Sequence, residues 1–177
     1  MLFPDLDEDT VFIHRTDPKE LLGVFSAHPI KLEGKEWPTV EHYFQAMKFV
    51  ESNPDYCEKI RQAPTAKMAR RMGRMRFKKL RADWAKVKRV YMTRGVYTKA
   101  SMYPEVANAL LATAKAKLME ASQYDYYWGC GRDRRAENTY GKVLMDVRKK
   151  LQEESTPVIS DKIPEQAPEQ GPEQGPE

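Results

Sequence analysis

The apolar residues of this chain follow two different spacings. An apolar run at 10–14 and an alternating segment at 30–37, centred on Glu33-Gly34, lie in the N-terminal part. The first predicts a strand, and the second predicts a hairpin because alternating runs on either side of a glycine turn are typical of antiparallel strands. After Pro38 the spacing becomes helical, with Thr39 as the expected N-cap. Helices are predicted at about 40–51, 55–62, 65–73, 81–100, 104–121 and 140–152.

These elements predict an α+β fold: a single, predominantly helical domain with a small antiparallel sheet near its N-terminus. The chain has 177 residues, 41% of them hydrophobic and 32% charged, which is typical of one globular domain. It contains no apolar run of about 20 residues, so neither a membrane span nor a signal peptide is expected. Cys57 and Cys130 form no close pair and suit no common metal spacing, which favours a reducing, cytoplasmic setting.

The C-terminal part differs in composition from the rest. Residues 152–177 contain seven acids and one base and repeat Pro-Glu-Gln, so few apolar groups are present to offset the entropy of ordering. We therefore expect a folded domain at 1–151 and an extended, disordered acidic tail at 152–177, which either solubilises the protein or shields its basic body. The body has 29 Lys and Arg against 19 Asp and Glu, a net charge of +10.

A first candidate site lies in the predicted helix at 40–51. At 100° per residue, Glu41, Gln45 and Lys48 fall within one narrow sector, whereas most other positions are apolar or aromatic. A helix that is apolar on nearly every side is usually buried, and its polar side chains must then find partners or line a wet cleft. An ordinary surface ion pair between Glu41 and Lys48 explains the pattern equally well.

A second candidate is the segment at 120–132, in which aromatic residues stand beside a carboxylate and two glycines follow. Such a loop can stack on a planar ring and bring its backbone close to a ligand, and arginines near a helix N-terminus favour phosphate. A packing loop with turn glycines is the alternative, since a lone Gly-x-Gly is a weak signal. The residues concerned are Asp125, Trp128, Gly129, Gly131 and Arg132, with Asn138 at the start of the last helix.

The segment 61–94 is dense in Lys and Arg, with Asp83 as its single acid. This density favours an anionic partner held through phosphate contacts, although a solvated helix face is the commoner explanation. Trp84 interrupts the basic run as either a core residue or a stacking platform. No metal site is expected, because the three histidines lack metal-binding spacing, and no phosphate loop or nucleophile elbow is present.

Several segments, in this order, resemble the NADAR family, which includes YbiA-like N-glycosidases of riboflavin biosynthesis intermediates. The resemblance covers about residues 10–151 and rests on 34–49, 69–74, 80–84, 110–114 and 120–145. It implies hydrolysis, without a cofactor, of the N-glycosidic bond between a phosphorylated ribose and a base. In one branch the substrates are phosphoribosylated aminopyrimidines, and in another they are ADP-ribosylated guanines of nucleic acid. The chain has Val24 where the family usually has an asparagine, which removes a presumed ligand contact.

The resemblance also implies roles for the candidate residues. Cleavage of the C–N bond builds positive charge on the ribose and negative charge on the base, so we expect Glu41 and Asp125 as the acid/base and charge-stabilising carboxylates. Lys48 would be either a proton donor or an amine that forms a transient Schiff base with opened ribose, and burial would lower its pKa and favour the amine. The expected substrate-binding residues are Gln45, Trp84, Trp128, Gly129, Gly131, Arg132 and Asn138.

Two other functions stay open at this point. A non-catalytic module that binds ADP-ribose or a nucleotide would use the aromatic loop without needing the polar sector of the first helix. A basic nucleic-acid-binding protein would bind tightly with a steep salt dependence and would have no site for a small ligand. The presence of Glu41, Lys48 and Asp125 together favours the enzyme.

Overall fold

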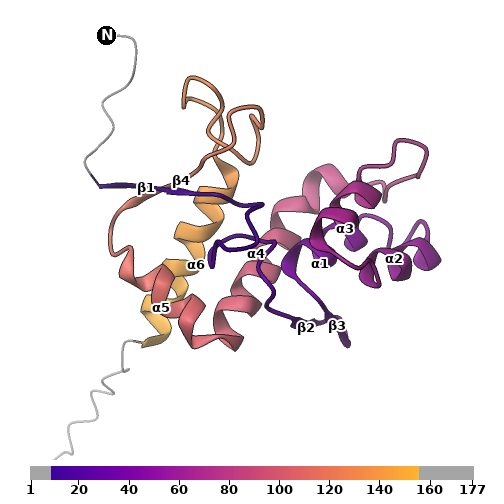
Figure 1. The fold of residues 1–177 in the computed structure, drawn as a ribbon, viewed down its shortest axis with the longest axis horizontal. Helices are drawn as coiled ribbons and strands as arrows, with labels where there is room; N and C mark the ends of the chain where they lie inside the picture. Colours follow the sequence, from indigo (N-terminus) through magenta and orange to yellow (C-terminus); the bar gives the residue numbers. More distant parts are fainter. Residues whose placement is uncertain (1–8, 156–177) are drawn as a thin grey trace, which may run out of the picture.

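The computed structural model describes residues 9–155, so residues 156–177 of the predicted acidic tail lie outside it (Figure 1). The predicted mostly helical α+β class with small sheets is confirmed. The elements in chain order are β1 (Thr10–Ile13), β2 (Ile30–Leu32), β3 (Lys35–Trp37), α1 (Val40–Met47), α2 (Pro54–Arg61), α3 (Ala66–Gly73), α4 (Trp84–Met102), α5 (Pro104–Ala112), β4 (Lys117–Glu120) and α6 (Thr139–Ser155).

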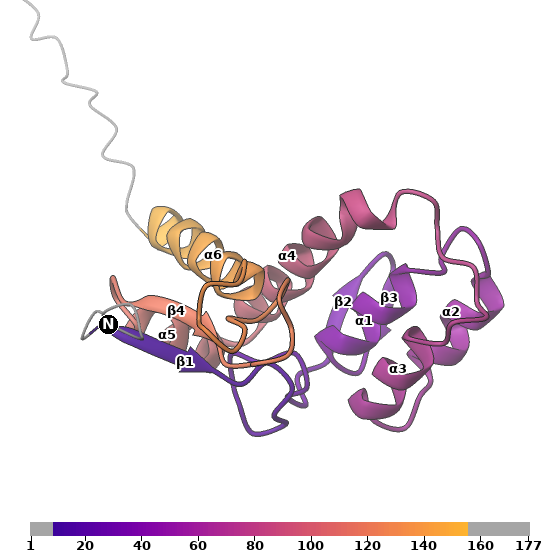
Figure 2. The same cartoon turned by 90° about the horizontal axis from the view of Figure 1, so that it is seen from above.

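The longest helix, α4, runs through the middle of the molecule and contacts α1, α5, α6 and β2. Figures 1 and 2 show α5, α6, β1 and β4 on one side of it, and α1 to α3 with the β2–β3 hairpin on the other. The hydrophobic core continues across both sides, from Ile60 in α2 through Met92 in α4 to Leu144 in α6. The two groups of elements therefore share one core, built around α4.

The strands form two separate pairs. The predicted hairpin is present, with β2 antiparallel to β3 and Glu33-Gly34 at the turn, both in the left-handed region. The other pair corrects the prediction of one helix over 104–121: α5 ends at Ala112, and Lys117–Glu120 form β4, parallel to β1. The helix-forming Ala, Leu and Lys residues of this segment suit a helix locally, but pairing with β1 and burial of Leu118 and Met119 override that preference.

The short helices α1, α2 and α3 each begin at a polar N-cap. The side chains of Thr39, Asn53 and Thr65 accept hydrogen bonds from backbone N–H groups of the first helical turn. Every residue of α1 is buried, as expected for a helix with few polar positions. Helix α1 thus lies in the core, and its polar side chains must be accommodated there.

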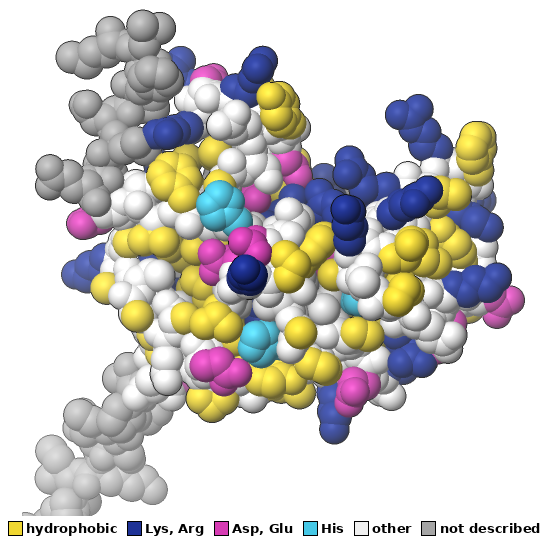
Figure 3. Space-filling model, viewed as in Figure 1, with side chains coloured by type: hydrophobic (Ala, Val, Ile, Leu, Met, Phe, Trp, Pro, Cys, Tyr) yellow, Lys and Arg dark blue, Asp and Glu magenta, His cyan; other side chains and the backbone are white. Residues whose placement is uncertain are grey.

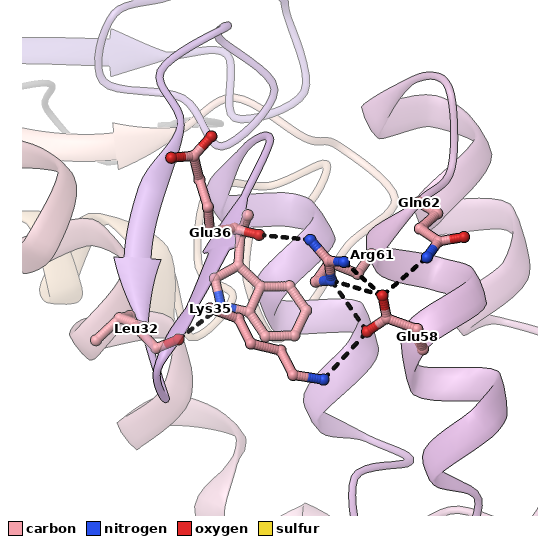
Figure 4. Close-up of polar contacts among 7 residues, drawn as sticks. Leu32, Lys35, Glu36, Glu58, Arg61 and Gln62 are labelled. Carbon is pink, nitrogen blue, oxygen red and sulfur yellow. Dashed lines mark hydrogen bonds and ion pairs between the residues drawn. The ribbon is translucent and has the colours of Figure 1, made fainter.

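Polar contacts attach the hairpin to α2 (Figure 4). Lys35 Nζ lies 3.1 Å from Glu58 Oε2, and Arg61 donates both to the Glu36 carbonyl and to Glu58. Buried Trp37 anchors the hairpin to the core and donates its indole N–H to the Leu32 carbonyl at 2.9 Å. The ion pairs are partly exposed and contribute little, so burial of the indole is the main attachment.

Neither cysteine forms a disulfide; Cys57 and Cys130 are both buried and free. Within residues 9–155 no helix is both long enough and apolar enough to cross a membrane.

Candidate active site

A cavity of about 520 Å³ opens between α1, the end of α3, the start of α4 and the loop that follows β4. Among the described residues that line it, Asp125 is the one acid, whereas six side chains are cationic. Figure 3 shows Lys and Arg gathered on this side of the molecule, over α3 and the segment after it. This charge favours an anionic ligand. The six cationic residues are Arg15, Lys48, Arg70, Arg74, Arg81 and Lys88.

Helix α1 supplies the predicted polar sector. Glu41 is fully buried and Gln45 is 3% exposed, which excludes the surface ion pair that the sequence left open. Gln45 Nε2 donates to Glu41 Oε1 at 2.7 Å, and Arg70 Nη1 lies 3.7 Å from the same oxygen. Gln45 and Lys48 line the cavity, while Glu41 lies directly behind Gln45. Glu41 Oε2 is buried and has no hydrogen-bond partner among the described residues.

Lys48 follows the last residue of α1, and aromatic rings surround its ammonium group. Its Nζ lies 5.7 Å from the ring centre of Phe44 and 5.8 Å from that of Trp84. The same nitrogen donates to the Gly73 carbonyl at the end of α3, at 3.1 Å. These contacts hold the amine in the wall of the cavity, at the junction of α1, α3 and α4.

Burial lowers the pKa of Lys48 from its usual 10.5 to about 8. This value includes the negative charge of Glu41, which raises the pKa, and the positive charges of Arg70, Arg74 and Lys88, which lower it. A lysine with this pKa is about a tenth neutral at pH 7, far more than an exposed lysine. The site therefore holds an amine that can act as a nucleophile near neutral pH.

Asp125 is fixed on both of its oxygens. Oδ2 accepts from Arg15 Nη2 at 2.8 Å, and Oδ1 accepts from the backbone N–H groups of Tyr127 and Trp128 at 3.2 and 2.8 Å. Arg15 is 2% exposed and interacts with no other carboxylate by an ion pair within residues 9–155. Sequence reasoning missed Arg15, because a single arginine after a strand has no spacing signal and its partner is 110 residues away.

Aromatic rings form a further part of the cavity wall, next to Lys48 and Asp125. Phe44 of α1 contacts both predicted tryptophans, with ring centres 5.1 Å from Trp84 and 5.5 Å from Trp128. Both tryptophans line the cavity. Five of the predicted residues, Gln45, Lys48, Trp84, Asp125 and Trp128, thus surround one hollow, and Glu41 lies behind it.

Comparison with known proteins shows the family of this chain. The family model of the NADAR domain, which describes its sequence, matches residues 11–152. The chain belongs to the NADAR family. It is 42% identical over 146 residues to the N-glycosidase YbiA of Escherichia coli. The aligned region covers 81% of this chain and 90% of that protein. An N-glycosidase of Nostoc punctiforme is 35% identical, covering 81% of this chain and 93% of its own length.

The NMR structure of E. coli YbiA superposes with a TM-score of 0.73 at 39% identity, covering 84% of this chain and 89% of that one. A chloroplastic riboflavin biosynthesis protein PYRR of Zea mays is 40% identical over 140 residues, but the matched region is 72% of this chain and 22% of the maize protein. These likenesses confirm the expected family, the YbiA-like fold and the expected enzyme class, a hydrolase of N-glycosyl bonds.

Four of the predicted binding residues of this NADAR domain lie outside the main cavity. Gly129 is packed so closely that an added Cβ would come within 2.8 Å of the Asp125 carbonyl. The Asn138 side chain bonds the Glu120 N–H and the Leu118 carbonyl, each at 2.8 Å, and so fastens the loop to β4. Gly131 and Arg132 line a separate hollow of about 430 Å³ beside β1. The loop folds back along β4, which separates these positions from Asp125 and Trp128.

A basic groove of about 430 Å³ adjoins the main cavity and is lined by Lys67, Arg70, Arg71, Arg74 and Met75. Arg70 and Arg74 line both hollows. The basic density predicted at 61–94 is thus partly concentrated beside the NADAR cavity. For the part of the chain that the structure describes, no group of three or more His, Cys, Asp or Glu residues is arranged to hold a metal ion.

Proposed function

We propose that this NADAR protein hydrolyses the C–N bond between a ribose phosphate and an aminopyrimidine, as in early riboflavin intermediates. The observation that carries the proposal is Lys48, an amine of lowered pKa in the same cavity as Asp125 and beneath Trp84. The printed names of the relatives from maize and Vibrio vulnificus, both riboflavin biosynthesis proteins, support this substrate class.

In this proposal the substrate base stacks between the two tryptophans, and the ribose phosphate faces the cations. Trp84 and Trp128 both line the cavity and both contact Phe44, so their rings offer flat surfaces to a planar base. Arg70 and Arg74 come from α3 and the residue after it, and their guanidinium groups suit bidentate contacts with phosphate. This arrangement places the anomeric carbon near the Lys48 amine.

Lys48 then reacts as a neutral amine. Its nitrogen forms a bond to the anomeric carbon while the bond to the base nitrogen breaks, and the base departs with a proton. The product is a glycosylamine, and its bond between C1 and the ring oxygen breaks as that oxygen takes a proton, which gives a Schiff base between the opened ribose and Lys48. Water adds to C1 and the bond from C1 to Nζ breaks, which releases the sugar phosphate and restores the amine. The free Oε2 of Glu41 takes and returns the proton, directly or through a water. Asp125, held by Arg15 and two backbone N–H groups, stabilises the positive charge on the ribose.

The test is incubation of the protein with a phosphoribosyl aminopyrimidine, with the released base detected by mass spectrometry. Wild type should release base, whereas Lys48→Met and Glu41→Gln should lose at least 99% of the turnover. Lys86→Met is the matched control, because Lys86 is an exposed lysine that does not line the cavity. Borohydride added during turnover should trap the sugar on wild type but not on Lys48→Met. Wild-type turnover in Lys48→Met would overturn the proposal.

The basic groove favours a second candidate, ADP-ribosylated guanine, alone or in nucleic acid. A pyrophosphate needs more cationic contacts than a monophosphate, and the groove supplies Lys67 and Arg71 beyond the arginines of the main cavity. Replacement of Lys67 and Arg71 by glutamate should therefore lower kcat/KM for the ADP-ribosyl substrate at least tenfold and leave that for the monophosphate within twofold. Equal changes for both substrates would exclude a role for the groove in substrate choice.

A further inference from the structure

Lys99 of α4 is a buried lysine outside the cavity. Its side chain is 3% exposed, and its Nζ donates to the Leu21 carbonyl at 2.6 Å, to the Gly23 carbonyl at 2.7 Å and to the Ser26 hydroxyl. All three ammonium protons therefore have acceptors, and all three acceptors belong to one segment, residues 21–26. No carboxylate within residues 9–155 forms an ion pair with this ammonium group.

The segment held by Lys99 is also fixed by close packing. An added Cβ at Gly23 would lie 2.9 Å from the Arg15 carbonyl and 3.1 Å from that of His14, so only glycine allows the two backbone segments to approach this closely. Tyr140 of α6 donates its hydroxyl to the Leu22 carbonyl at 2.6 Å. The segment is thus clamped between α4 and α6 on one side and the residues after β1 on the other.

Hydrogen bonds connect Lys99 to the active-site residues through two successive peptide groups. Lys99 binds the carbonyl of the Gly23–Val24 peptide, and the N–H of the same peptide donates to the Arg15 carbonyl at 2.8 Å. The next carbonyl, that of Val24, accepts from the Glu41 N–H at 3.1 Å. One ammonium group therefore fixes the peptide that joins the backbone of Arg15 to the first turn of α1.

We propose that Lys99 is a positioning residue for the reaction: it holds the 21–26 segment so that Arg15 and Glu41 keep their relative places at the cavity. The inference rests on the proposed function of Glu41, and it adds a residue that makes no contact with the substrate. Arg15 in turn holds Asp125, so both carboxylates depend on the same clamp.

The energetics support a role beyond folding. An ammonium buried without a carboxylate partner is costly, and an apolar side chain at such a place in a core is often the more stable choice. Hydrogen bonds to three acceptors at defined positions give a fixed geometry that an apolar side chain does not provide. Lys99 therefore fixes the position of the 21–26 segment at a cost in folding stability.

The test compares Lys99→Met with Arg148→Met. Arg148 of α6 is 8% exposed and donates to Thr113 Oγ1 and the Ala116 carbonyl, so it is a buried cation that clamps a different loop, away from the cavity. Only Lys99→Met should lower kcat per folded molecule, by at least tenfold. Its KM should change less than threefold, because the proposed binding side chains Arg70, Trp84 and Trp128 lie on other segments.

A readout without substrate separates this inference from the proposed function. Amide hydrogen exchange at Glu41 should be at least tenfold faster in Lys99→Met than in wild type and unchanged in Arg148→Met. Wild type without N-glycosidase activity would overturn the proposed function, and the exchange rates would still test the clamp.

Ser26→Ala removes one acceptor of Lys99 and keeps two, so this variant should fold and lower kcat two- to fivefold. If Lys99→Met does not fold, Ser26→Ala provides the test in its place. Wild-type kcat in Ser26→Ala and Lys99→Met, equal losses in Arg148→Met, or unchanged exchange at Glu41 would overturn the inference.

Discussion

Arg15 and Asp125 are 110 positions apart and form a 2.8 Å ion pair in the wall of the cavity. The parallel pairing of β1 and β4 explains how they meet. Ile13 at the end of β1 lies opposite Glu120 at the end of β4. Because the strands are parallel, the segments that follow them leave the two-stranded sheet at the same edge. Arg15 and Asp125 follow these two ends, so the sheet, small as it is, brings the guanidinium to the carboxylate.

The first prediction separates the charge of Asp125 from its structural role. In Asp125→Asn the side-chain oxygen can still accept from the Tyr127 and Trp128 N–H groups, so these two loop contacts should remain, whereas the ion pair with Arg15 is lost. The variant loses the negative charge beside the sugar, and kcat should fall about 100-fold. Steady-state kinetics of base release, with near-UV circular dichroism to monitor the aromatic loop, would check this.

Arg15→Met is the complementary change. It leaves Asp125 without its guanidinium partner in a half-buried place, where the side chain is 27% exposed, so the free energy of unfolding should fall by about 1–3 kcal/mol. Urea unfolding of both variants measures the difference. A stable Arg15→Met protein with wild-type turnover would mean that the ion pair holds neither the loop nor the reaction.

Sequence periodicity was sufficient for the parts of the fold that local chemistry determines. The hairpin at Glu33-Gly34 and the capped helices α1 to α3 follow from turn residues and N-caps a few positions away. Strand β4 could not be predicted in this way, because Lys117–Glu120 suit a helix locally and become a strand only through pairing with β1.

The same division applies to the candidate site. The polar sector of α1 follows from helical spacing, and Trp84 and Trp128 were suggested by their surroundings in the sequence. The sequence could not show that Arg15 reaches Asp125, since the contact depends on where two distant loops leave the sheet. It also could not show that Arg132 faces a different hollow from Asp125, because the path of the loop along β4 decides this.

The second prediction concerns the pH dependence of turnover. The pKa of Lys48 is about 8, and the proposed nucleophile is the neutral amine, so kcat/KM should rise about tenfold per pH unit below that value and level off above it. The pKa of Lys99 is also about 8, but a neutral Lys99 keeps two N–H donors for its carbonyls and a lone pair for the Ser26 hydroxyl. We therefore expect that deprotonation of Lys99 causes no fall in kcat/KM at high pH. A profile that falls through pH 8 would instead assign Lys48 as a proton donor.

The third prediction concerns stability. Burial lowers the pKa values of Lys48 and Lys99 in the folded state, so between pH 8 and 10 the unfolded chain binds more protons than the folded one. The free energy of unfolding should consequently rise with pH in this window, by about 1–2 kcal/mol per pH unit. Lys48→Met should remove about half of this slope and be more stable than wild type at pH 7. Above pH 10 the slope should reverse, because burial raises the pKa values of Tyr43 and Tyr140.

Urea unfolding at pH 7, 8, 9 and 10 would measure the slope, with Lys86→Met as the control for loss of one exposed lysine. A stability that is flat from pH 8 to 10 in wild type would show that neither buried lysine has a lowered pKa. The gain of Lys48→Met at pH 7 should accompany its loss of turnover, as expected where a residue serves activity at the expense of stability.

The last prediction concerns Gly73, the final residue of α3, whose importance arises from packing and not from backbone conformation. A Cβ at this position would lie 2.0 Å from Gln45 Oε1 and 2.7 Å from Gln45 Cβ. The second contact is close to the backbone of α1, so rotation of the Gln45 side chain alone cannot relieve it. In Gly73→Ala the two helices must move apart, which displaces Gln45 from Glu41 and the Gly73 carbonyl from Lys48.

We expect Gly73→Ala to lower the free energy of unfolding by about 1–3 kcal/mol and kcat at least tenfold. Gly34→Ala is the matched control. Gly34 has a φ of +70° and no atom within 4 Å of an added Cβ, so alanine there introduces backbone strain in the hairpin turn without touching the cavity. It should cost about 1 kcal/mol of stability and leave kcat unchanged. Equal kcat in the two alanine variants would show that the contact between α1 and α3 does not set the geometry around Lys48.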